Sequence, residues 1–430
     1  MSDYEVDVTI QDGDLSESAL GGLTNNPERE EWFRDLGLGL FIHWSLDTPL
    51  GSVISHWMCG ADNSIRENFV ENFPALFNPR KFDADDWART AKLNGFRYMV
   101  FTTKHHAGFC MYDTGTTSFN VMNTAFGRDI HKELVESFRK MDIATGIYFS
   151  PFDFKWLIDN GKELHFATPE VLPENNPGLM TYNQTQLREL LTNYGKTDFV
   201  FFDGPPVGLK NLVWQADPQT LVTRGEMKTP EQELPNEPIE GVWEANYTLG
   251  TQWNYKATNE VYKSGTEIIE LLIATRARGG NLLLNITSDP HGFIPFEQER
   301  LLGELGLFLF FNGEAIYDVR PWVVTNDGPI YYTKAKESQT VYAFLTGEPW
   351  EYAQRKEVTL RSIRATENTE VSMVGQNGKV LEHSPHADIE TRGVQKNDGL
   401  HISTVRAYRP YNNRKWPNPA VLRITNAAPI

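Results

Sequence analysis

The chain has 430 residues, a length that fits two domains better than one and allows a large buried core. An apolar fraction of 40% with many aromatic rings excludes a disordered chain, and no run of about 18 or more apolar residues predicts a membrane span. The net charge of -17 argues against nucleic acid or an anionic membrane as partners, because both require basic surfaces.

Neither the N-terminal segment nor the cysteines indicate the cellular compartment. The N-terminal arm, residues 1–27, is acidic at its start and lacks the apolar segment of a signal peptide. The compartment therefore stays open: periplasmic or extracellular if a leader has been trimmed, and cytoplasmic otherwise. Cys59 and Cys110 form no disulfide framework, which leaves open one bridge or two buried thiols. The oligomeric state is open too.

From the arm to about residue 314, strand-like apolar runs alternate with helical patterns. Near-continuous apolar runs predict buried parallel strands, joined by helices in right-handed crossovers. The predicted strands are Gly39–Trp44, Arg97–Lys104, Thr145–Ser150, Thr197–Asp203, Thr220–Gly225, Val242–Tyr247 and Asn281–Ile286. The predicted helices are Glu28–Leu36, Asp83–Leu93, Gly127–Met141, Tyr182–Tyr194, Gly265–Arg278 and Pro295–Phe311.

An open sheet and a closed barrel both satisfy this alternation. Several runs end in polar residues at their C-terminal side, and in a barrel these ends meet at one mouth, where active sites lie. No glycine-rich nucleotide motif favours the open sheet. We therefore expect the α/β class, with a (β/α)8-like barrel over residues 28–314.

From about Ala315 the pattern changes to short alternating runs separated by Gly, Asn, Asp and Pro. This pattern predicts an antiparallel β-sandwich over residues 315–430. Its predicted strands are Ile330–Lys334, Gln339–Leu345, Glu357–Leu360, Glu370–Met373, Leu400–Ser403 and Ala420–Ile424.

Asp203 follows four apolar residues in DFVFFDG, which places a carboxylate at the end of a buried strand. A retaining glycosidase needs such a nucleophile and a second carboxylate about 5–5.5 Å away as the acid/base. The candidates for the second carboxylate are Asp153, Glu226, Glu231 and Glu244. Glu231 lies on the loop after the next strand, which fits this role. Glu244 lies inside a strand-like run, which favours a structural role.

Four histidines lie at predicted strand ends or on nearby loops: His43, His56, His105 and His106. A neutral imidazole offers one donor and one acceptor, which suits sugar hydroxyls better than a structural or metal-binding role. Adjacent residues point to opposite sides of a strand, so His105 and His106 are not expected to share an ion. We expect no metal and no cofactor.

Taken together, the motifs resemble glycoside hydrolase family 29, the α-L-fucosidases. The resemblance is carried by WFRDLGLGLFIHW, FDADDWARTAKLNGFRYMVFTTKHHAGF, TDFVFFDG, RGEMKTPEQELP, GVWEANYTLGTQWNY and GGNLLLNITSDPHGFIP. It implies a (β/α)8-like catalytic domain, a C-terminal β-sandwich, and double displacement with net retention and no metal.

The resemblance also assigns roles. By position, Asp203 matches the family's nucleophile and Glu231 matches an acid/base carried by a TPE-like loop, with Glu244 as the fallback. The matching sugar-contacting positions are His43, Trp57, His105, His106, Tyr148, Arg224 and Trp253. Three residues depart from the usual pattern and bear on substrate identity: His56, Ala107 and Phe201 stand where Glu, Asp and Trp are common.

The sequence therefore predicts a retaining exo-α-L-fucosidase that releases terminal fucose from fucosylated oligosaccharides or polysaccharides. Two alternatives remain close: an α-L-galactosidase with the same mechanism, and a catalytically weak, glycan-binding relative. A metal-dependent hydrolase is a third.

Overall fold

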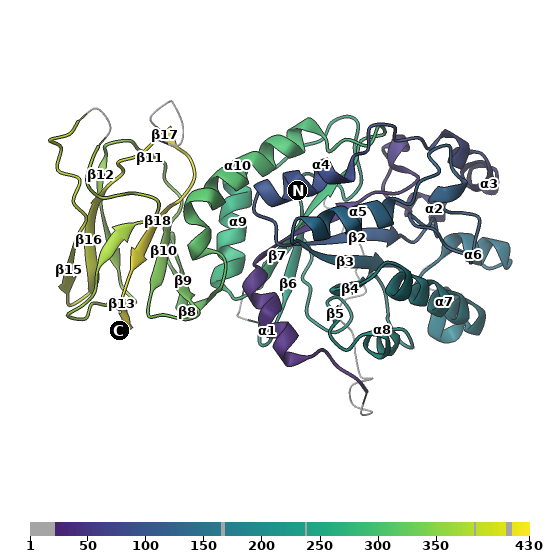
Figure 1. Ribbon diagram of the computed structural model, residues 1–430, viewed down its shortest axis with the longest axis horizontal. Helices are drawn as coiled ribbons and strands as arrows, with labels where there is room; N and C mark the ends of the chain where they lie inside the picture. Colours follow the sequence, from purple (N-terminus) through teal and green to yellow (C-terminus); the bar gives the residue numbers. More distant parts are fainter. Residues whose placement is uncertain (1–21, 165–167, 237–238, 382–383, 410–414) are drawn as a thin grey trace.

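The computed structural model describes residues 22–164, 168–236, 239–381, 384–409 and 415–430. Most of the predicted arm, residues 1–27, lies outside these ranges. Figure 1 shows a parallel sheet surrounded by helices and, beside it, a group of antiparallel sheets. Among the helices of the described ranges, none combines the length and apolar character needed to cross a bilayer.

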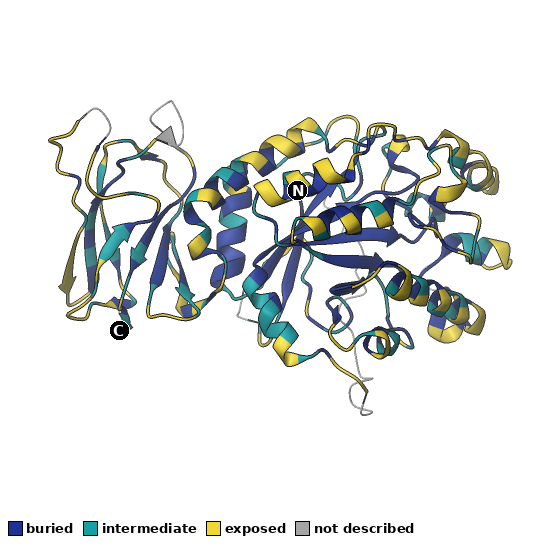
Figure 2. Cartoon of the chain, in the orientation of Figure 1, coloured by how far each residue is buried: buried dark blue, intermediate teal, exposed yellow. Residues whose placement is uncertain are grey.

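The parallel sheet is curled and has seven strands, in the order β5-β4-β3-β2-β1-β7-β6. The strands are β1 (Leu38–His43), β2 (Tyr98–Lys104), β3 (Ala144–Phe149), β4 (Phe199–Phe202), β5 (Leu221–Val222), β6 (Glu244–Thr248) and β7 (Asn281–Thr287). All seven predicted strands are confirmed. Their residues are buried almost throughout, as the continuous apolar runs require (Figure 2).

The two edge strands of this sheet, β5 and β6, are connected by the chain that follows β5. Single backbone bridges join Lys228 to Trp243 and Glu231 to Asn246, in parallel orientation. Residues 228–232, which we call the linking segment, thus run along β6. Because the linking segment also continues from β5, it places Glu231 beside the sheet.

Helices cover the outside of the sheet, and side-chain caps fix where several of them begin. The larger helices are α1 (Pro27–Leu36), α4 (Ala84–Leu93), α5 (Ile130–Lys140), α7 (Pro177–Asn193), α9 (Gly265–Ala277) and α10 (Phe296–Asn312). These six confirm the predicted helices, although α7 begins earlier because Asn176 caps it and Pro177 suits its first turn. The sequence pattern does not predict the short helices α2 (Trp57–Gly60), α3 (Asn63–Glu71), α6 (Phe154–Asp159) and α8 (Lys210–Ala216).

The C-terminal part contains a five-stranded sheet, β14-β18-β10-β9-β8, and a three-stranded sheet, β12-β16-β15, besides two short pairs, β11-β17 and β13-β19. Their bounds are β8 (Val319–Asp327), β9 (Ile330–Ala335), β10 (Val341–Leu345), β11 (Trp350–Glu351), β12 (Arg355–Leu360), β13 (Ile363–Arg364), β14 (Val371–Met373), β15 (Arg392–Lys396), β16 (Gly399–Val405), β17 (Lys415–Trp416), β18 (Ala420–Ile424) and β19 (Ala428–Pro429). One buried cluster includes Tyr332 and Leu422 from the larger sheet and Leu360 and Ile402 from the smaller one.

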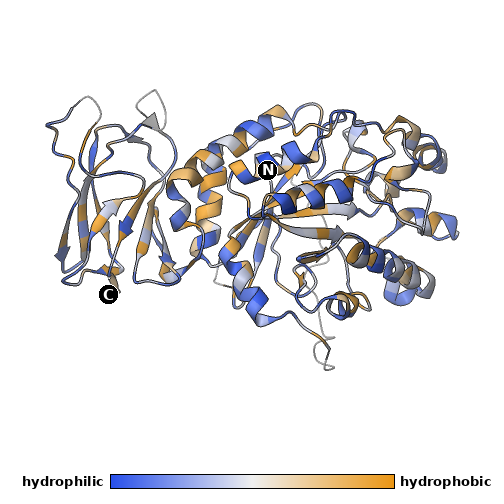
Figure 3. Cartoon of the chain, in the orientation of Figure 1, coloured by the Kyte–Doolittle hydropathy of each residue, from blue (hydrophilic) through white to orange (hydrophobic). Residues whose placement is uncertain are grey.

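Helices α9 and α10 lie between the parallel sheet and the antiparallel sheets, and α9 is largely hydrophobic (Figures 1 and 3). A single apolar cluster extends from Leu305 of α10 to Phe344 of β10 and Val421 of β18. At its edge Arg320 and Lys336 contact Asp35 at 2.7 and 2.8 Å. The arrows of β2 and β3 point away from this contact, so the C-terminal ends of these strands face the opposite side of the molecule (Figure 1).

Candidate active site

The candidate site lies at the C-terminal ends of the parallel strands, where their polar continuations meet. Its members are His43 at the end of β1, His105 and His106 after β2, Tyr148 in β3, Asp203 after β4, Arg224 after β5, Glu231 on the linking segment and Trp253 after β6. His56 and Trp57 come from the start of α2. These ends of adjacent parallel strands necessarily share one edge of the sheet.

Asp203 has three neighbours that stabilise its ionised form. The Tyr148 hydroxyl donates to Oδ2, His106 Nε2 lies 3.3 Å from Oδ2, and Arg224 Nη1 donates to Oδ1 at 3.1 Å. Burial alone would raise the pKa of Asp203, but these three neighbours lower it to about 2. The side chain keeps 25% of its surface exposed. Asp203 is therefore an ionised carboxylate that a ligand can reach.

The guanidinium of Arg224 connects Asp203 to Glu231. Its Nη2 donates to Glu231 Oε2 at 2.6 Å, and its Nε donates to Thr229 Oγ1 at 3.1 Å. Burial alone would lower the pKa of Arg224, but the two carboxylates raise it. Because a guanidinium is a rigid planar fork, it fixes both carboxylates at once. Glu231, like Asp203, remains partly exposed.

The other candidate carboxylates are engaged elsewhere. Glu244 lies at the start of β6, fully buried, and its Oε2 accepts the Tyr98 hydroxyl at 2.5 Å. Burial raises its pKa to about 7. Asp153 caps α6 and lies 3.4 Å from Lys104, and Glu226 lies 2.9 Å from Lys210. Each of these three carboxylates is thus paired with a side chain outside the group of candidate site residues.

Three buried histidines present neutral rings. Their Nδ1 atoms are hydrogen-bonded, His43 to Asn285 Oδ1 at 2.6 Å, His105 to Ser55 Oγ at 2.9 Å and His106 to Ser150 Oγ at 2.6 Å. Burial lowers the pKa of all three, to about 4 for His43, to about 3 for His106 and well below its usual value for His105. With Nδ1 engaged, Nε2 is the atom that His43 and His105 can offer to a ligand, whereas Nε2 of His106 already lies 3.3 Å from Asp203.

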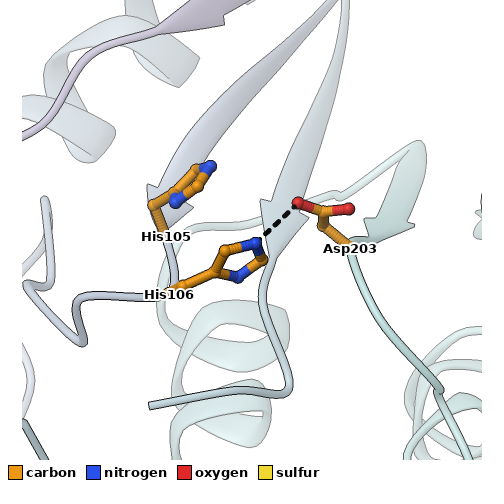
Figure 4. A group of neighbouring side chains, drawn as sticks. All are labelled: His105, His106 and Asp203. Carbon is orange, nitrogen blue, oxygen red and sulfur yellow. Dashed lines mark ion pairs between the residues drawn. The ribbon is translucent and has the colours of Figure 1, made fainter. Parts of the chain in front are cut away.

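His105, His106 and Asp203 form a group with the donor atoms of a possible metal site, since one ligand atom from each lies within 4.8 Å of the others (Figure 4). The expectation that strand alternation separates the two histidines is wrong, because β2 ends at Lys104 and both rings lie in the turn beyond it, 4.3 Å apart. A cation here would sit beside the Arg224 guanidinium and compete with it for Asp203. The arrangement therefore suits hydrogen bonding better than metal binding.

Aromatic rings complete the site. Tyr148 stacks on His105 at 5.2 Å, and Trp253 lies 5.0 Å from His43 between ring centroids. His56, half-buried, lies 5.2 Å from His106. The half-buried Trp57 packs edge-on against a neighbouring phenylalanine and donates its Nε1–H to a buried aspartate on the loop after β1.

Several polar residues of the site were not predicted. Asn285 interrupts the apolar run of β7, and that interruption was a readable signal for a residue that faces the site. Ser55 and Ser150 gave no such signal, because loop serines are common. Both cysteines are free thiols, Cys110 buried and Cys59 partly exposed.

The site thus contains two partly exposed carboxylates that share one guanidinium. Neutral histidines and aromatic rings surround them at the C-terminal ends of the parallel strands. This composition is typical of a glycoside hydrolase site. The family model described as Alpha-L-fucosidase matches residues 21–314. The tissue alpha-L-fucosidase of Mus musculus is 30% identical over 81% of this chain and 83% of its own length, and the alpha-L-fucosidase of Dictyostelium discoideum is 27% identical over 80% and 85%.

Solved structures agree on the fold. Alpha-L-fucosidase isoenzyme 1 from Paenibacillus thiaminolyticus matches 93% of this chain and 98% of its own, with a TM-score of 0.75 and 24% identity. A Bacteroides thetaiotaomicron alpha-L-fucosidase, solved as a trapped covalent intermediate with 2-fluoro-fucosyl fluoride, matches 94% and 97%, with a TM-score of 0.75 and 22% identity. The chain therefore belongs to the alpha-L-fucosidase family, glycoside hydrolase family 29, and is a glycoside hydrolase.

Proposed function

We propose that the protein is an exo-acting, retaining α-L-fucosidase that releases terminal α-L-fucose from fucosylated glycans. The observation that carries the proposal is the Arg224 guanidinium, which contacts both Asp203 and Glu231 while each carboxylate stays partly exposed. A retaining mechanism requires two carboxylates only about 5–5.5 Å apart, and a shared planar group favours such a short separation.

In the first step a carboxylate oxygen of Asp203 attacks the anomeric carbon and the bond to the leaving oxygen breaks. Glu231 gives its proton to that oxygen. In the second step Glu231 takes a proton from water, whose oxygen then attacks the anomeric carbon and releases Asp203. The first step needs a protonated Glu231, so its ionic contact with Arg224 must weaken when the substrate is bound.

The remaining site residues bind the sugar in this proposal. The neutral rings of His43, His105 and His106 donate to or accept from ring hydroxyls, which a charged imidazolium could not do in both directions. Trp253 provides an apolar surface for the C6 methyl group. The trapped fucosyl intermediate of the Bacteroides relative supports the covalent step and the glycone.

We also propose the finer architecture. The linking segment takes the place of an eighth strand and so closes a (β/α)8-like barrel over residues 28–314. The five- and three-stranded sheets pack face to face as a β-sandwich over residues 315–430, supported by the buried cluster to which both contribute.

A second candidate glycone is α-L-galactose, which adds one hydroxyl at C6. His56 favours it, because a half-buried imidazole beside His106 brings a hydroxyl-binding group to the edge of the site. A pocket built for a methyl group rejects an added hydroxyl only about a hundredfold. We therefore expect kcat/KM for 4-nitrophenyl α-L-fucoside to exceed that for the α-L-galactoside by about this factor, and a ratio near one would replace the glycone but keep the mechanism.

The decisive experiment is turnover of 4-nitrophenyl α-L-fucoside with the anomer of the first product followed by proton NMR. Release of the α-anomer supports retention, and the β-anomer would overturn it. No turnover of any α-L-fucoside or α-L-galactoside would leave a glycan-binding relative. A parallel reaction in EDTA tests the metal-dependent alternative. We expect no loss of rate, whereas a metal-dependent hydrolase would lose activity.

A further inference from the structure

Asp47, on the loop after β1, is a buried carboxylate at the centre of a small hydrogen-bond network. Its side chain is completely inaccessible to solvent. Oδ2 accepts from the backbone N–H of Ser55 at 2.7 Å and from Trp57 Nε1 at 3.1 Å, and Oδ1 accepts from Asn254 Nδ2 at 3.4 Å. Among the described residues, no lysine or arginine forms an ion pair with it, and while burial raises its pKa, the nearby His56 lowers it.

Each of these three contacts leads to a residue that the proposed function assigns to sugar binding. Trp57 is itself such a residue. Ser55 uses its Oγ to contact Nδ1 of His105, and Asn254 follows Trp253 directly in the chain. Asp47 thus connects the loop after β1, the start of α2 and the loop after β6 from a single point.

The backbone at Ser55 shows that this network constrains the loop. Ser55 has a φ of 59°, in the left-handed region that a residue with a side chain seldom adopts. Its N–H is held by Asp47 and its hydroxyl by His105, so both ends of the residue are fixed. Within the described part of the chain, the Asp47 carboxylate is the acceptor for the Ser55 N–H, and no second acceptor replaces it.

A charged carboxylate is a costly choice for a purely structural crosslink inside a protein. Burial raises the pKa of Asp47 to about 6, so it is ionised near neutral pH. Its three donors are all N–H groups, which a carboxylate can accept together and a neutral amide can accept only in part. A carboxylate at position 47 therefore satisfies the three donors better than an amide would.

We propose that Asp47 is a positioning residue that sets the orientation of Trp57, His105 and Trp253 toward the bound sugar. The inference rests on the proposed function, since it concerns how the same site holds its glycone. Asp47 touches none of the reacting atoms and acts through the three residues it orients.

Asp47→Asn tests the proposal with the smallest possible change. The oxygen of the new amide still accepts from Ser55 and Trp57. Its nitrogen now faces Asn254 Nδ2, and because both groups are donors, this hydrogen bond is lost. KM for 4-nitrophenyl α-L-fucoside should rise about tenfold, the effect of one lost hydrogen bond to a charged group, while kcat changes less than about threefold. The double variant Asp47→Asn/Asn254→Asp restores a donor–acceptor pair and should recover most of the wild-type KM.

Asp62→Asn is the matched control. Asp62 also accepts a backbone N–H, that of Ile65 at 3.0 Å, on the same stretch of chain. It caps α3, and its hydrogen bonds within the described part of the chain involve no candidate site residue. It should leave KM unchanged. Ser55→Ala, which keeps the N–H contact but removes the hydroxyl from His105, should raise KM alone.

The outcomes separate clearly. Wild-type activity with an unchanged KM in Asp47→Asn, or failure of the double variant to recover KM in a folded protein, would overturn the positioning role and leave the proposed function standing. An equal loss of kcat in both Asp47→Asn and Asp62→Asn would show a general loss of loop stability and would also overturn it. A wild-type enzyme inactive on α-L-fucosides would instead refute the proposed function.

Discussion

Asp203 is both accessible and charged, since its side chain is partly exposed and its neighbours lower its pKa to about 2. We expect Asp203→Ala to lower kcat/KM by at least about a thousandfold, because it removes the proposed covalent step, while the protein still folds. Steady-state kinetics and thermal unfolding test both parts. A variant within about tenfold of wild type would remove Asp203 from the mechanism.

Glu231 and Glu244 differ in their surroundings. Glu231 contacts the guanidinium that also contacts Asp203, whereas Glu244 is buried in the sheet against Tyr98. Glu231→Ala should slow fucosides with poor leaving groups far more than the nitrophenyl substrate, because only the former need a proton. Azide should restore part of the rate by attacking the intermediate without a base. Azide rescue of Glu244→Ala, and not of Glu231→Ala, would reverse the assignment.

Glu244 makes a prediction about stability. Its folded pKa of about 7 lies above the ordinary 4.5, so its stabilising contribution is complete below about pH 4.5 and is lost as the pH rises through 7. Glu244→Gln keeps the shape of the neutral acid and cannot ionise. The variant should therefore gain about 3 kcal/mol over wild type at pH 8 relative to pH 4.5, measured by urea unfolding at both values. An equal pH dependence in both proteins would show that Glu244 does not titrate as its burial requires.

At the scale of the element, the linking segment depends on Asn246 of β6. Its side-chain Nδ2 donates to the carbonyl oxygens of Thr229 and Pro230, both at 3.3 Å. Asn246→Ala should lower kcat about tenfold for poor leaving groups and little for 4-nitrophenyl fucoside, because Glu231 loses its support while Asp203 does not. Asn160→Ala, which removes a similar side-chain contact at the end of α6, is the control. Equal losses on both substrates would contradict this account.

The seven parallel strands could be predicted because buried strands carry continuous apolar runs, and the polar residues after them could be predicted to share one edge. The sequence pattern does not predict the strands β8 and β15, for different reasons. Strand β8 contains Pro321, which argues against a strand. All five residues of β15 are exposed, so no alternation of apolar and polar residues marks it. In the site, residues at strand ends were found, whereas Asp47 and Ser55 were not. Their importance comes from contacts between loops, which sequence spacing does not encode.

For the whole molecule, the shared apolar cluster joins the antiparallel sheets to the parallel sheet, whose far end carries the candidate site. Phe344→Ala should cost about 3–5 kcal/mol and lower the temperature at which activity is lost, although Phe344 lies far from Asp203. Val394→Ala, at an exposed position of β15, should change neither. Thermal inactivation and near-UV circular dichroism should show one transition at the same temperature. Early loss of the C-terminal signal with activity intact would show that the two parts unfold independently.

The linking segment also bears on how such a protein can change over generations. It joins β6 by two single bridges, whereas Asp203 follows a strand that is paired on both sides. Insertions or replacements around Glu231 therefore disturb few backbone hydrogen bonds, while a change at the position of Asp203 disturbs the end of a strand that is paired on both sides. Descendants of one ancestor can consequently exchange the proposed proton donor, and with it the leaving groups they accept, while the proposed nucleophile is inherited in place.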